Sequence, residues 1–241
     1  MTETPPHPYR ADAYLTEAEA PVLAVEAGRV RLDRSLFYPA GGGQPGDAGR
    51  IAWDGVEAEV VDSVKGPDET VELVLAEGAP APAPGTVVVQ RLDAGRRRAH
   101  MRVHTALHLL SVVIPLPVTG GSIAADKGRL DFDMEAPPED KAALEAALQA
   151  LIDADHPVTE DWITEAELEA NPGLVKTMSV KPPTGQGRVR LIRIGAGEAP
   201  VDLQPCGGTH VRATGEIGRV RLGKIEKKGR RNRRVTLHLE G

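Results

Sequence analysis

Cysteine and aromatic residues are scarce in this chain of 241 residues. Cys206 is its one cysteine, so an intrachain disulfide cannot form, which suits a reducing compartment. Phe, Trp and Tyr together make up only 3% of the residues. A hydrophobic core must therefore rest on Leu, Val, Ile and Ala. The same scarcity argues against sequence-specific reading of single-stranded RNA by a row of aromatic side chains.

Long hydrophobic runs are missing as well. The most apolar stretch, residues 109–118, is far shorter than the roughly 20 residues of a membrane-spanning helix and contains two prolines. The N-terminal residues hold no apolar segment of the kind found in signal peptides. With 41% hydrophobic and 27% charged residues, the composition is that of an ordinary globular protein. We therefore expect a cytoplasmic protein that does not enter a membrane.

Charge is unevenly distributed along the chain. The net charge of −6 argues by itself against a nucleic-acid partner. Residues 212–234, however, hold ten Lys and Arg against two Glu, a local +8, whereas residues 139–169 hold ten acids against one Lys, a local −9. A solvated face is the ordinary explanation for a charge run, but this density of cations is typical of a surface that contacts phosphates. The candidates for phosphate contact at the expected hairpin tip are Lys227, Lys228, Arg230, Arg231 and Arg233.

Residues 1–92 predict β structure. Short apolar runs at 22–27, 30–32, 51–53, 56–61, 71–75 and 87–92 are separated by turns rich in Gly and Pro. The dipeptide Asp54-Gly55 favours a type I′ hairpin turn. No part of this stretch has a convincing helical period. We expect an N-terminal domain at 1–92 that forms a small β-barrel.

Beyond residue 92 helices and strands occur in groups. Helices are expected at 96–113 and 139–154, and a short one after the capping box of Thr164 and Glu167. Strands are expected at 129–132, 189–194, 201–203, 218–225 and 234–239, with residues 120–128 as a loop and 226–233 as a hairpin tip. The predicted fold class is α+β, with a second domain at 93–241.

Four side chains that commonly bind metals stand in two separated pairs. His104 and His108 are four residues apart in an expected helix, so both imidazoles lie on one face. Cys206 and His210 occur in the sequence CGGTH, whose two glycines favour a turn that folds around an ion. One thiolate and three imidazoles are a normal tetrahedral ligand set for zinc. The sequence therefore predicts a zinc site.

Each half of this set has an ordinary explanation when taken alone. Two histidines at this spacing occur by chance on helix surfaces, and a lone cysteine often serves as a small apolar residue. The combination of both halves favours zinc. A zinc protease would need a glutamate directly after His104 as its general base, and Thr105 stands there. The protease interpretation therefore fails on chemistry.

The segment GGGQPG at 41–46 formally matches the GxGxxG motif of dinucleotide-binding folds. Pro45 lies inside it, and an expected strand follows where the motif requires a helix, so this interpretation also fails. Two alternatives remain: a plain turn between strands, or a loop whose bare backbone approaches a ligand or a neighbouring domain. Three consecutive glycines exceed what a hairpin requires and favour the second.

Four segments, taken in order, resemble one family. They are FYPAGGGQPGD at 37–47, the pair His104 and His108, DKGRLDF at 126–132, and CGGTHV at 206–211. This series is similar to the editing domain of alanyl-tRNA synthetase and to its freestanding AlaX-type relatives, over about residues 20–240. A related zinc-binding module occurs in threonyl-tRNA synthetase, but the glycine-rich segment points to the alanyl branch.

The resemblance implies one zinc ion per chain and hydrolysis of mischarged Ser-tRNA(Ala), with Gly-tRNA(Ala) left open. It further implies an N-terminal β-barrel followed by an α/β-sandwich editing domain, as in the medium-length members. The expected partner is the acceptor end of tRNA(Ala). Short strands account for the first 92 residues, so we expect no synthetase core, no aminoacylation and no use of ATP.

Selecting serine over alanine requires a group that hydrogen-bonds the extra hydroxyl. Thr119, which follows the expected zinc helix, resembles a family threonine near the substrate. Gly42, Gly43, Gln44 and Lys127 are further candidates for substrate contact. The structural alternatives are a loop-capping threonine and a lysine on a strand edge. No carboxylate stands where a general base must be, so the catalytic base is unassigned.

Two other functions fit parts of the pattern. One is a non-catalytic, zinc-containing tRNA-binding protein. The other is a hydrolase of a small ester or amide, which would not need the basic segment at 212–234. An assay for deacylation distinguishes an editing enzyme from the non-catalytic tRNA-binding protein. The dependence of hydrolysis on tRNA distinguishes it from the hydrolase of a small ester or amide. The sequence leaves the oligomeric state open, and also whether zinc keeps an open coordination position.

Overall fold

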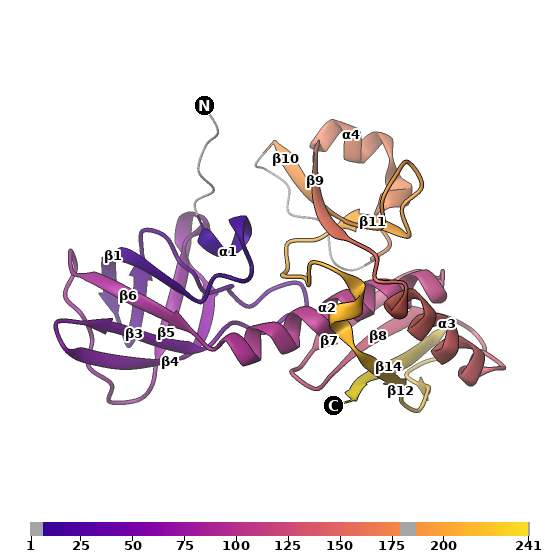
Figure 1. Cartoon of the computed structure of the whole chain (residues 1–241), viewed down its shortest axis with the longest axis horizontal. Coiled ribbons are helices and arrows are strands. Elements are labelled where there is room, and N and C mark those ends of the chain that lie inside the picture. Colours follow the sequence, from indigo (N-terminus) through magenta and orange to yellow (C-terminus); the bar gives the residue numbers. More distant parts are fainter. Residues whose placement is uncertain (1–6, 179–186, 241) are drawn as a thin grey trace. The chain divides into compact units, whose positions relative to one another are not determined.

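Six antiparallel strands close into a barrel in the computed structural model of this chain (Figure 1). The structure describes residues 7–178 and 187–240, and it falls into two units, Met1–His100 and Met101–Gly241. The barrel lies in the first unit, with the strand order β1-β2-β5-β4-β3-β6. Its strands are β1 (Glu17–Glu26), β2 (Arg29–Leu32), β3 (Gly49–Trp53), β4 (Val56–Lys65), β5 (Val71–Leu75) and β6 (Val87–Leu92). The small barrel that the short apolar runs predict is therefore present.

Period-two alternation explains why these strands curl around a core. In β5, Val71, Leu73 and Leu75 are buried while the residues between them are partly exposed. The two central residues of the turn between β3 and β4, Asp54 and Gly55, have φ of 45° and 77°. These positive values match the type I′ turn predicted there. Two short helices complete the first unit: α1 (Pro8–Ala11) and η1 (Pro67–Glu69).

A buried ion pair connects the glycine-rich segment with the first turn of helix α2 (Ala94–Val113). The guanidinium of Arg97 donates two hydrogen bonds from Nε to the Asp47 carboxylate, at 2.9 and 3.1 Å. It also donates to the carbonyls of Leu36, at 2.9 Å, and Ala13, at 2.8 Å. Asp47 accepts a further bond from the Tyr38 amide at 2.6 Å. Because both charges are almost fully buried, this pair fixes residues 36–47 against the helix start.

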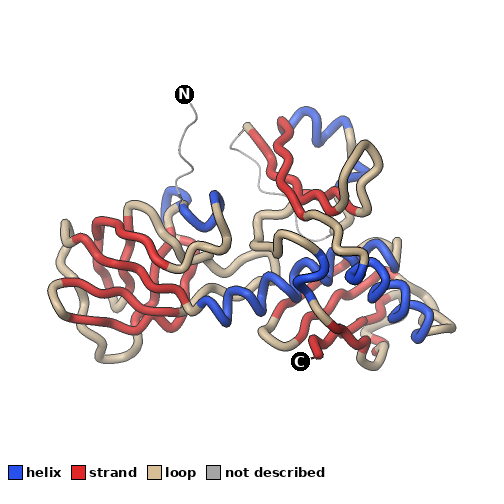
Figure 2. Tube along the Cα trace, viewed as in Figure 1, coloured by secondary structure: helices blue, strands red, loops and turns tan. Residues whose placement is uncertain are grey.

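The second unit contains two antiparallel sheets and two helices that follow α2. One sheet has the order β12-β14-β8-β7, with β13 paired to β14, and the other has the order β11-β10-β9. The strands are β7 (Val118–Ile123), β8 (Lys127–Asp133), β9 (Val158–Thr164), β10 (Arg188–Ile194), β11 (Asp202–Pro205), β12 (Arg219–Leu222), β13 (Glu226–Lys227) and β14 (Asn232–Glu240). The helices are α3 (Lys141–Asp153) and α4 (Glu165–Ala170), with the 3-10 turns η2 (Pro172–Leu174) and η3 (Thr214–Ile217). Figure 2 shows these helices and strands in groups, as the α+β prediction requires.

Helix α2 packs closely on the first of these sheets at Gly128 in β8. A Cβ atom at this position would lie 2.5 Å from Val103 and 2.9 Å from Leu107, so any larger residue would force these side chains to move. One face of α2 therefore packs on this sheet. Another face contacts side chains from β11 and from the loop that follows it. No helix in the described parts of the chain is long and apolar enough to span a membrane.

Two strands are absent from the sequence prediction, and the strand expected at 218–225 is shorter, because β12 ends at Leu222. Residues 118–123, of which 120–123 were expected in a loop, form β7, although Gly120 and Gly121 have low strand propensity. Pairing with β8 outweighs this propensity. Strand β9 was missed because its sequence, VTEDWIT, is polar at an edge of the sheet. The capping box is confirmed, since Glu167 N donates to Thr164 Oγ1 at 3.1 Å and Thr164 N to Glu167 Oε2 at 2.7 Å.

Candidate metal centre

Helix α2 supplies the first two side chains of a buried cluster. His104 and His108 stand one helical turn apart, with ring centroids 5.3 Å from each other. Both are less than a tenth exposed. The helix runs without Gly or Pro from Arg96 to Val113. The face of the helix that carries both histidines is covered by the loop after β11, which buries them.

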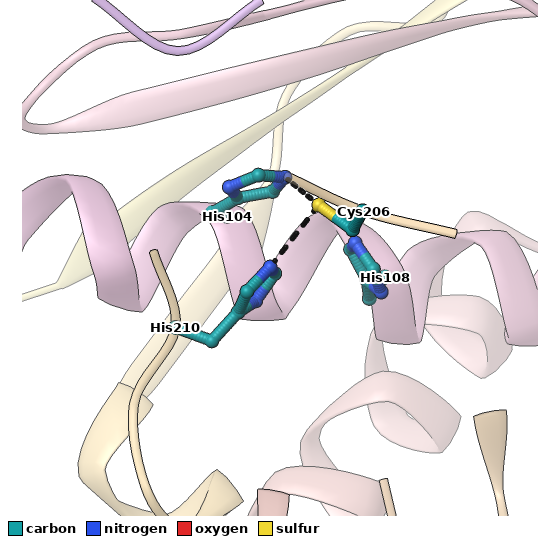
Figure 3. Close-up of side chains that lie close together, drawn as sticks. All are labelled: His104, His108, Cys206 and His210. Carbon is teal, nitrogen blue, oxygen red and sulfur yellow. Dashed lines mark hydrogen bonds between the residues drawn. The ribbon is translucent and has the colours of Figure 1, made fainter. Parts of the chain in front are cut away.

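The loop after β11 supplies the other two side chains. Cys206 Sγ lies 3.4 Å from His104 Nε2 and 3.3 Å from His210 Nε2. One ligand atom from each of the four residues lies within 4.8 Å of all the others. Figure 3 shows the three imidazoles gathered around the sulfur atom. The structure thus brings together the four residues that the sequence pairs predict as metal ligands.

The nitrogens of two imidazoles that point away from the cluster have fixed partners. His108 Nδ1 lies 3.0 Å from Asp202 Oδ2. His210 Nδ1 lies 3.1 Å from Thr105 Oγ1, whose own hydrogen goes to the Met101 carbonyl at 2.9 Å. The threonine oxygen therefore accepts from an Nδ1–H group, which leaves Nε2 of His210 unprotonated and directed at the sulfur. Outer partners of this kind orient metal-binding histidines.

Asp202 is the centre of a buried polar network. Its carboxylate, which is fully buried, also accepts hydrogen bonds from Lys176 Nζ at 2.5 Å and Gln204 Nε2 at 2.7 Å. Burial acts to raise the pKa of Asp202, but the bonds from His108 and Lys176 lower that pKa to about 2. The carboxylate is therefore ionised across the neutral range.

Electrostatics in the cluster favour the metal-binding forms of Cys206 and His210, whereas His108 retains its proton. Burial acts to raise the pKa of the Cys206 thiol, but the neighbouring His104 and His210 hold it well below its usual value. Burial and the charge of His104 lower the pKa of His210. Burial would also lower the pKa of His108, yet its bonds to Asp202 and Cys206 raise that pKa to about 9. A cation that replaces the proton on His108 would take over this stabilisation by the carboxylate and the sulfur.

Arg190 in β10 holds the loop that carries Cys206. Its Nη1 donates to the carbonyls of Cys206, at 3.0 Å, and Gly208, at 2.8 Å. The Cys206 amide in turn donates to the Arg190 carbonyl at 3.2 Å, and the Gly208 amide points to the sulfur at 3.4 Å. These contacts fix the backbone on both sides of the thiol.

The donor set fits zinc. A tetrahedral site with Zn–S of about 2.3 Å and Zn–N of about 2.0–2.1 Å separates neighbouring ligand atoms by roughly 3.5 Å. The sulfur–nitrogen distances of 3.3 and 3.4 Å agree with this spacing. One sulfur and three imidazole nitrogens also match the softness that zinc prefers over magnesium or calcium.

The candidate substrate residues lie on two different elements of the second unit and on one loop of the first. Thr119 stands in β7, where its hydroxyl donates to the Asp131 carbonyl at 3.0 Å and accepts from Asn232 Nδ2 at 2.9 Å. Lys127 begins β8 and is exposed, paired in register with His238 of β14. Neither residue has a contact that assigns it a role in substrate binding.

The glycine-rich segment forms a tight turn at the surface of the first unit. Gly41 and Gln44 exchange two backbone hydrogen bonds, both of 3.0 Å. Gly42 and Gly43, with φ of 59° and 85°, form its exposed tip, whereas the Gln44 side chain is buried. The positive φ values require glycine, and the tip offers bare backbone.

The basic segment is partly neutralised within the protein. Lys228 Nζ lies 2.9 Å from Glu226 Oε2, and Arg231 Nε lies 3.1 Å from Asp133 Oδ1. Arg234 binds both carboxylate oxygens of Asp131, at 2.8 and 2.9 Å. Acidic side chains therefore offset part of the local charge of +8. The exposed cations at the tip are Lys227, Lys228, Arg230 and Arg231.

Arg233 differs from its neighbours because it is 8% exposed. Its guanidinium donates to the backbone carbonyls of Gly229, at 3.1 Å, Asn232, at 3.0 Å, and Glu135. Alternation along β14 turns this side chain inward. Arg233 therefore closes the hairpin, and a surface role is physically inconsistent with its burial.

Sequence reasoning missed the residues that support the cluster: Thr105, Lys176, Arg190, Asp202 and Gln204. A signal was present for two of them. Asp202 and Gln204 precede Cys206 at a spacing of two, so in a strand all three side chains share one face. Lys176 and Arg190 are distant in sequence, and no spacing connects them with the metal ligands.

Comparison with known proteins gives matches over almost the whole chain. The family described as the threonyl and alanyl tRNA synthetase second additional domain matches residues 189–236. An alanyl-tRNA editing protein AlaX-M from Methanosarcina acetivorans is 36% identical over 238 residues, which cover 94% of this chain and 96% of that protein. Another AlaX-M protein, from Methanosarcina mazei, is 34% identical over 96% of this chain and 95% of its own length.

Alanine–tRNA ligases are similar to the chain over one part of their length. The ligase of Pyrobaculum neutrophilum is 36% identical over 225 residues, which are 90% of this chain and 25% of the ligase. The chain thus corresponds to about a quarter of such an enzyme, whereas it matches the two editing proteins over 94–96% of its own length and 95–96% of theirs.

Proposed function

The chain belongs to the family of AlaX-M alanyl-tRNA editing proteins, and from this membership we propose that it hydrolyses mischarged Ser-tRNA(Ala) in trans. The scissile bond is the ester between the amino acid and a ribose hydroxyl of the terminal adenosine. The observation that carries the proposal is the buried cluster of three histidines and one cysteine, with outer partners on His108 and His210.

We further propose that His104, His108, Cys206 and His210 hold one zinc ion. Bound zinc would supply a Lewis acid that, by expanding from four to five ligands, could orient or acidify a water molecule or fix the amino group of the substrate. Asp202 keeps His108 turned with Nε2 toward the cluster, and Thr105 does the same for His210. Arg190 fixes the backbone around Cys206. Fixed ligands of this kind keep the geometry of the site constant while substrate binds.

Selection of serine is assigned in this proposal to Thr119. Its hydroxyl is oriented by the Asp131 carbonyl and by Asn232, and an oriented hydroxyl pairs better with a seryl hydroxyl than a rotating one does. An alanyl group cannot donate the additional hydrogen bond that a seryl hydroxyl can give to the Thr119 oxygen, so the correct amino acid is bound less well. The exposed backbone of Gly42 and Gly43 and the side chain of Lys127 are proposed as further contacts with the aminoacylated end. The side chain of Gln44 is buried and is therefore left out.

The tRNA surface is proposed on the exposed cations of the β13–β14 hairpin, namely Lys227, Lys228, Arg230 and Arg231. Arg233 is left out because it is buried. We also propose that residues 93–241 form the editing domain, of the α/β-sandwich type, and residues 1–92 the accompanying barrel domain. The proposed location is the cytoplasm, where aminoacyl-tRNA is used.

A deacylation assay tests the function directly. The protein with zinc is incubated with Ser-tRNA(Ala) and Gly-tRNA(Ala), with Ala-tRNA(Ala) and Thr-tRNA(Thr) as controls. We expect rapid release of serine and little release from either control. Binding of tRNA without release of any amino acid would instead identify a non-catalytic tRNA-binding protein, and hydrolysis of seryl esters without tRNA would identify a small-ester hydrolase.

A further inference from the structure

An exposed tryptophan lies on the sheet face that supports the metal centre. Trp162 in β9 is 42% exposed and is one of two tryptophans in the chain. Its direct cross-strand partner in β10 is Arg190, whose guanidinium holds the carbonyls of Cys206 and Gly208. Directly opposed residues of antiparallel strands have Cβ atoms about 5 Å apart on the same face. The indole is therefore one side chain away from the loop of the metal centre.

The strand register shows that this face is continuous. Arg190 and Ile192 alternate along β10 on the face of Trp162, and Ile192 is paired in register with Gln204 of β11. Ile192 and Gln204 are buried, whereas Trp162 is exposed. In Figure 1 this small sheet of β9, β10 and β11 stands beside α2, which carries two of the metal ligands. The face thus runs from a covered end at the cluster to an open end at the indole.

Arg188 completes the open end. It is exposed, and its guanidinium carbon lies 6.0 Å from the centroid of the Trp162 ring. Arg188 and Arg190 lie on the same face of β10 as Trp162, and the guanidinium of Arg190 is directed to the loop of Cys206. The opposite face of the sheet is different, since Val189 and Leu191 are buried there.

A flat apolar ring beside fixed cations suits one kind of ligand. Nucleobases stack on indole rings and on guanidinium planes, and the phosphate next to the base pairs with the cation. Such stacking does not depend on base identity, because every base has a π-face. The low aromatic content excludes a row of such platforms, but a single stack needs only one ring.

We propose that Trp162 and Arg188 form a stacking platform for an unpaired nucleobase at the 3′ end of tRNA, with Arg188 at its phosphate. The 3′ end carries the aminoacyl ester, and the platform lies on the sheet face that leads to the cluster. This inference deepens the proposed function and rests on it for the identity of the RNA. The platform holds the 3′ end of the RNA in place and does not touch the ester.

Fluorescence of Trp162 tests the platform without relying on catalysis. In a Trp53→Phe background Trp162 is the one remaining indole. We expect uncharged tRNA to quench its emission, and we expect tRNA trimmed of its unpaired 3′ nucleotides to quench it far less. Equal quenching by both RNAs, or quenching by neither, would overturn the proposal. This readout stays valid even if the protein hydrolyses no aminoacyl-tRNA, an outcome that would overturn the proposed function and leave the platform standing.

Kinetics of matched variants give a second readout. Replacing Trp162 by Ala should raise the Michaelis constant for Ser-tRNA(Ala) roughly tenfold, as the loss of one base stack predicts, and leave kcat and metal content nearly unchanged. Trp162→Phe should recover most of the loss because it keeps an aromatic face. Arg188→Ala should raise the Michaelis constant and lower its salt dependence. Arg193→Ala removes a cation from the opposite face, where Arg193 pairs with Asp161. This control variant should change neither the Michaelis constant nor its salt dependence.

Equal Michaelis constants for the wild type and Trp162→Ala, in protein that hydrolyses Ser-tRNA(Ala), would overturn the platform. So would an equal loss in Arg188→Ala and Arg193→Ala, because the effect would then be general electrostatic attraction.

Discussion

His108 Nδ1 lies 3.0 Å from a carboxylate oxygen of Asp202, a residue that is fully buried and accepts bonds from Lys176 and Gln204 as well. The carboxylate therefore fixes which nitrogen of His108 faces the cluster. Loss of an outer partner of this kind typically lowers metal affinity 10–100-fold.

Replacing Asp202 by Ala should accordingly weaken zinc binding by about 10–100-fold, measured by competition with a chromogenic chelator. Asp202→Asn should lower zinc affinity less, because its amide oxygen still accepts a hydrogen bond from His108 Nδ1–H although it lacks the negative charge. Asp161→Asn is a matched control in β9 of the same sheet, where the carboxylate pairs with Arg193 and is far more exposed than that of Asp202. Equal zinc affinity in Asp202→Ala and the control would show that the carboxylate does not orient His108.

Purified protein should contain about one zinc per chain. Cys206→Ala removes the one thiolate of the chain and should lower both zinc affinity and deacylation. Metal content of the dialysed variants, measured by mass spectrometry, checks this expectation. Full zinc occupancy in a Cys206→Ala, His210→Ala double variant would contradict the four-ligand site.

Replacing Thr119 by Val keeps the shape of the side chain and removes its hydroxyl. Hydrolysis of Ser-tRNA(Ala) should lose about 1–3 kcal/mol of transition-state stabilisation, the cost of an unpaired polar group. Any rate on Gly-tRNA(Ala) should change little, since glycine has no side-chain hydroxyl. Each substrate serves as a control for the other. An equal loss of hydrolysis rate on both substrates would mean that Thr119 acts only on the structure, through its bonds to Asp131 and Asn232.

Two arginines of the same hairpin should respond differently to replacement by Ala. Arg230 is exposed, so Arg230→Ala should flatten the plot of log tRNA affinity against log salt by about 0.7–0.9. Arg233 is buried on three carbonyls, so Arg233→Ala should lower the unfolding free energy by more than about 1 kcal/mol. Binding titrations at several salt concentrations and thermal unfolding separate the two effects. An unaltered salt slope in a Lys227→Ala, Arg230→Ala double variant would place the tRNA contact elsewhere.

Stability of the first unit should depend on pH through His100. Burial and the charges of Arg96 and Arg97 outweigh nearby carboxylates and lower the pKa of His100 from 6.5 to about 4. Between these two values the unfolded chain binds a proton that the folded chain does not, so stability falls as the pH falls from 6.5 to 4 and then levels off. The expected slope from this residue is at most about 1.4 kcal/mol per pH unit.

Unfolding followed by the emission of Trp53, in a Trp162→Phe background, checks this dependence. His100→Gln should remove the slope contributed by His100, because glutamine does not titrate. Identical slopes in both proteins would show that the acid sensitivity of the barrel has another origin.

The metal centre could be found from the sequence because its ligands follow local rules. A spacing of four places His104 and His108 on one helical face, and two glycines after Cys206 define a turn. The barrel strands followed from alternation and from Asp54-Gly55 in the same way. Each of these signals lies within a few residues of chain.

The remaining features depend on contacts between distant segments. Strand β7 contains two glycines and forms because β8 pairs with it. Arg233 looks like one more surface cation until the register of β14 turns it inward to carbonyls as far away as Glu135. The partner of His108 is 94 residues away in Asp202, and local spacing cannot connect the two.

The low pKa of Cys206 would also determine how the protein fails if the proposed metal were lost. A thiolate is the form of cysteine that peroxide attacks, and coordination shields it. Sulfenic acid on Cys206 could not be resolved within the molecule, because the chain has no second thiol. Further oxidation to the sulfinic acid is irreversible by ordinary thiols and removes one of the four ligands. Chelation in the presence of peroxide should therefore inactivate the protein permanently, whereas chelation under a reducing thiol should be reversed by adding zinc.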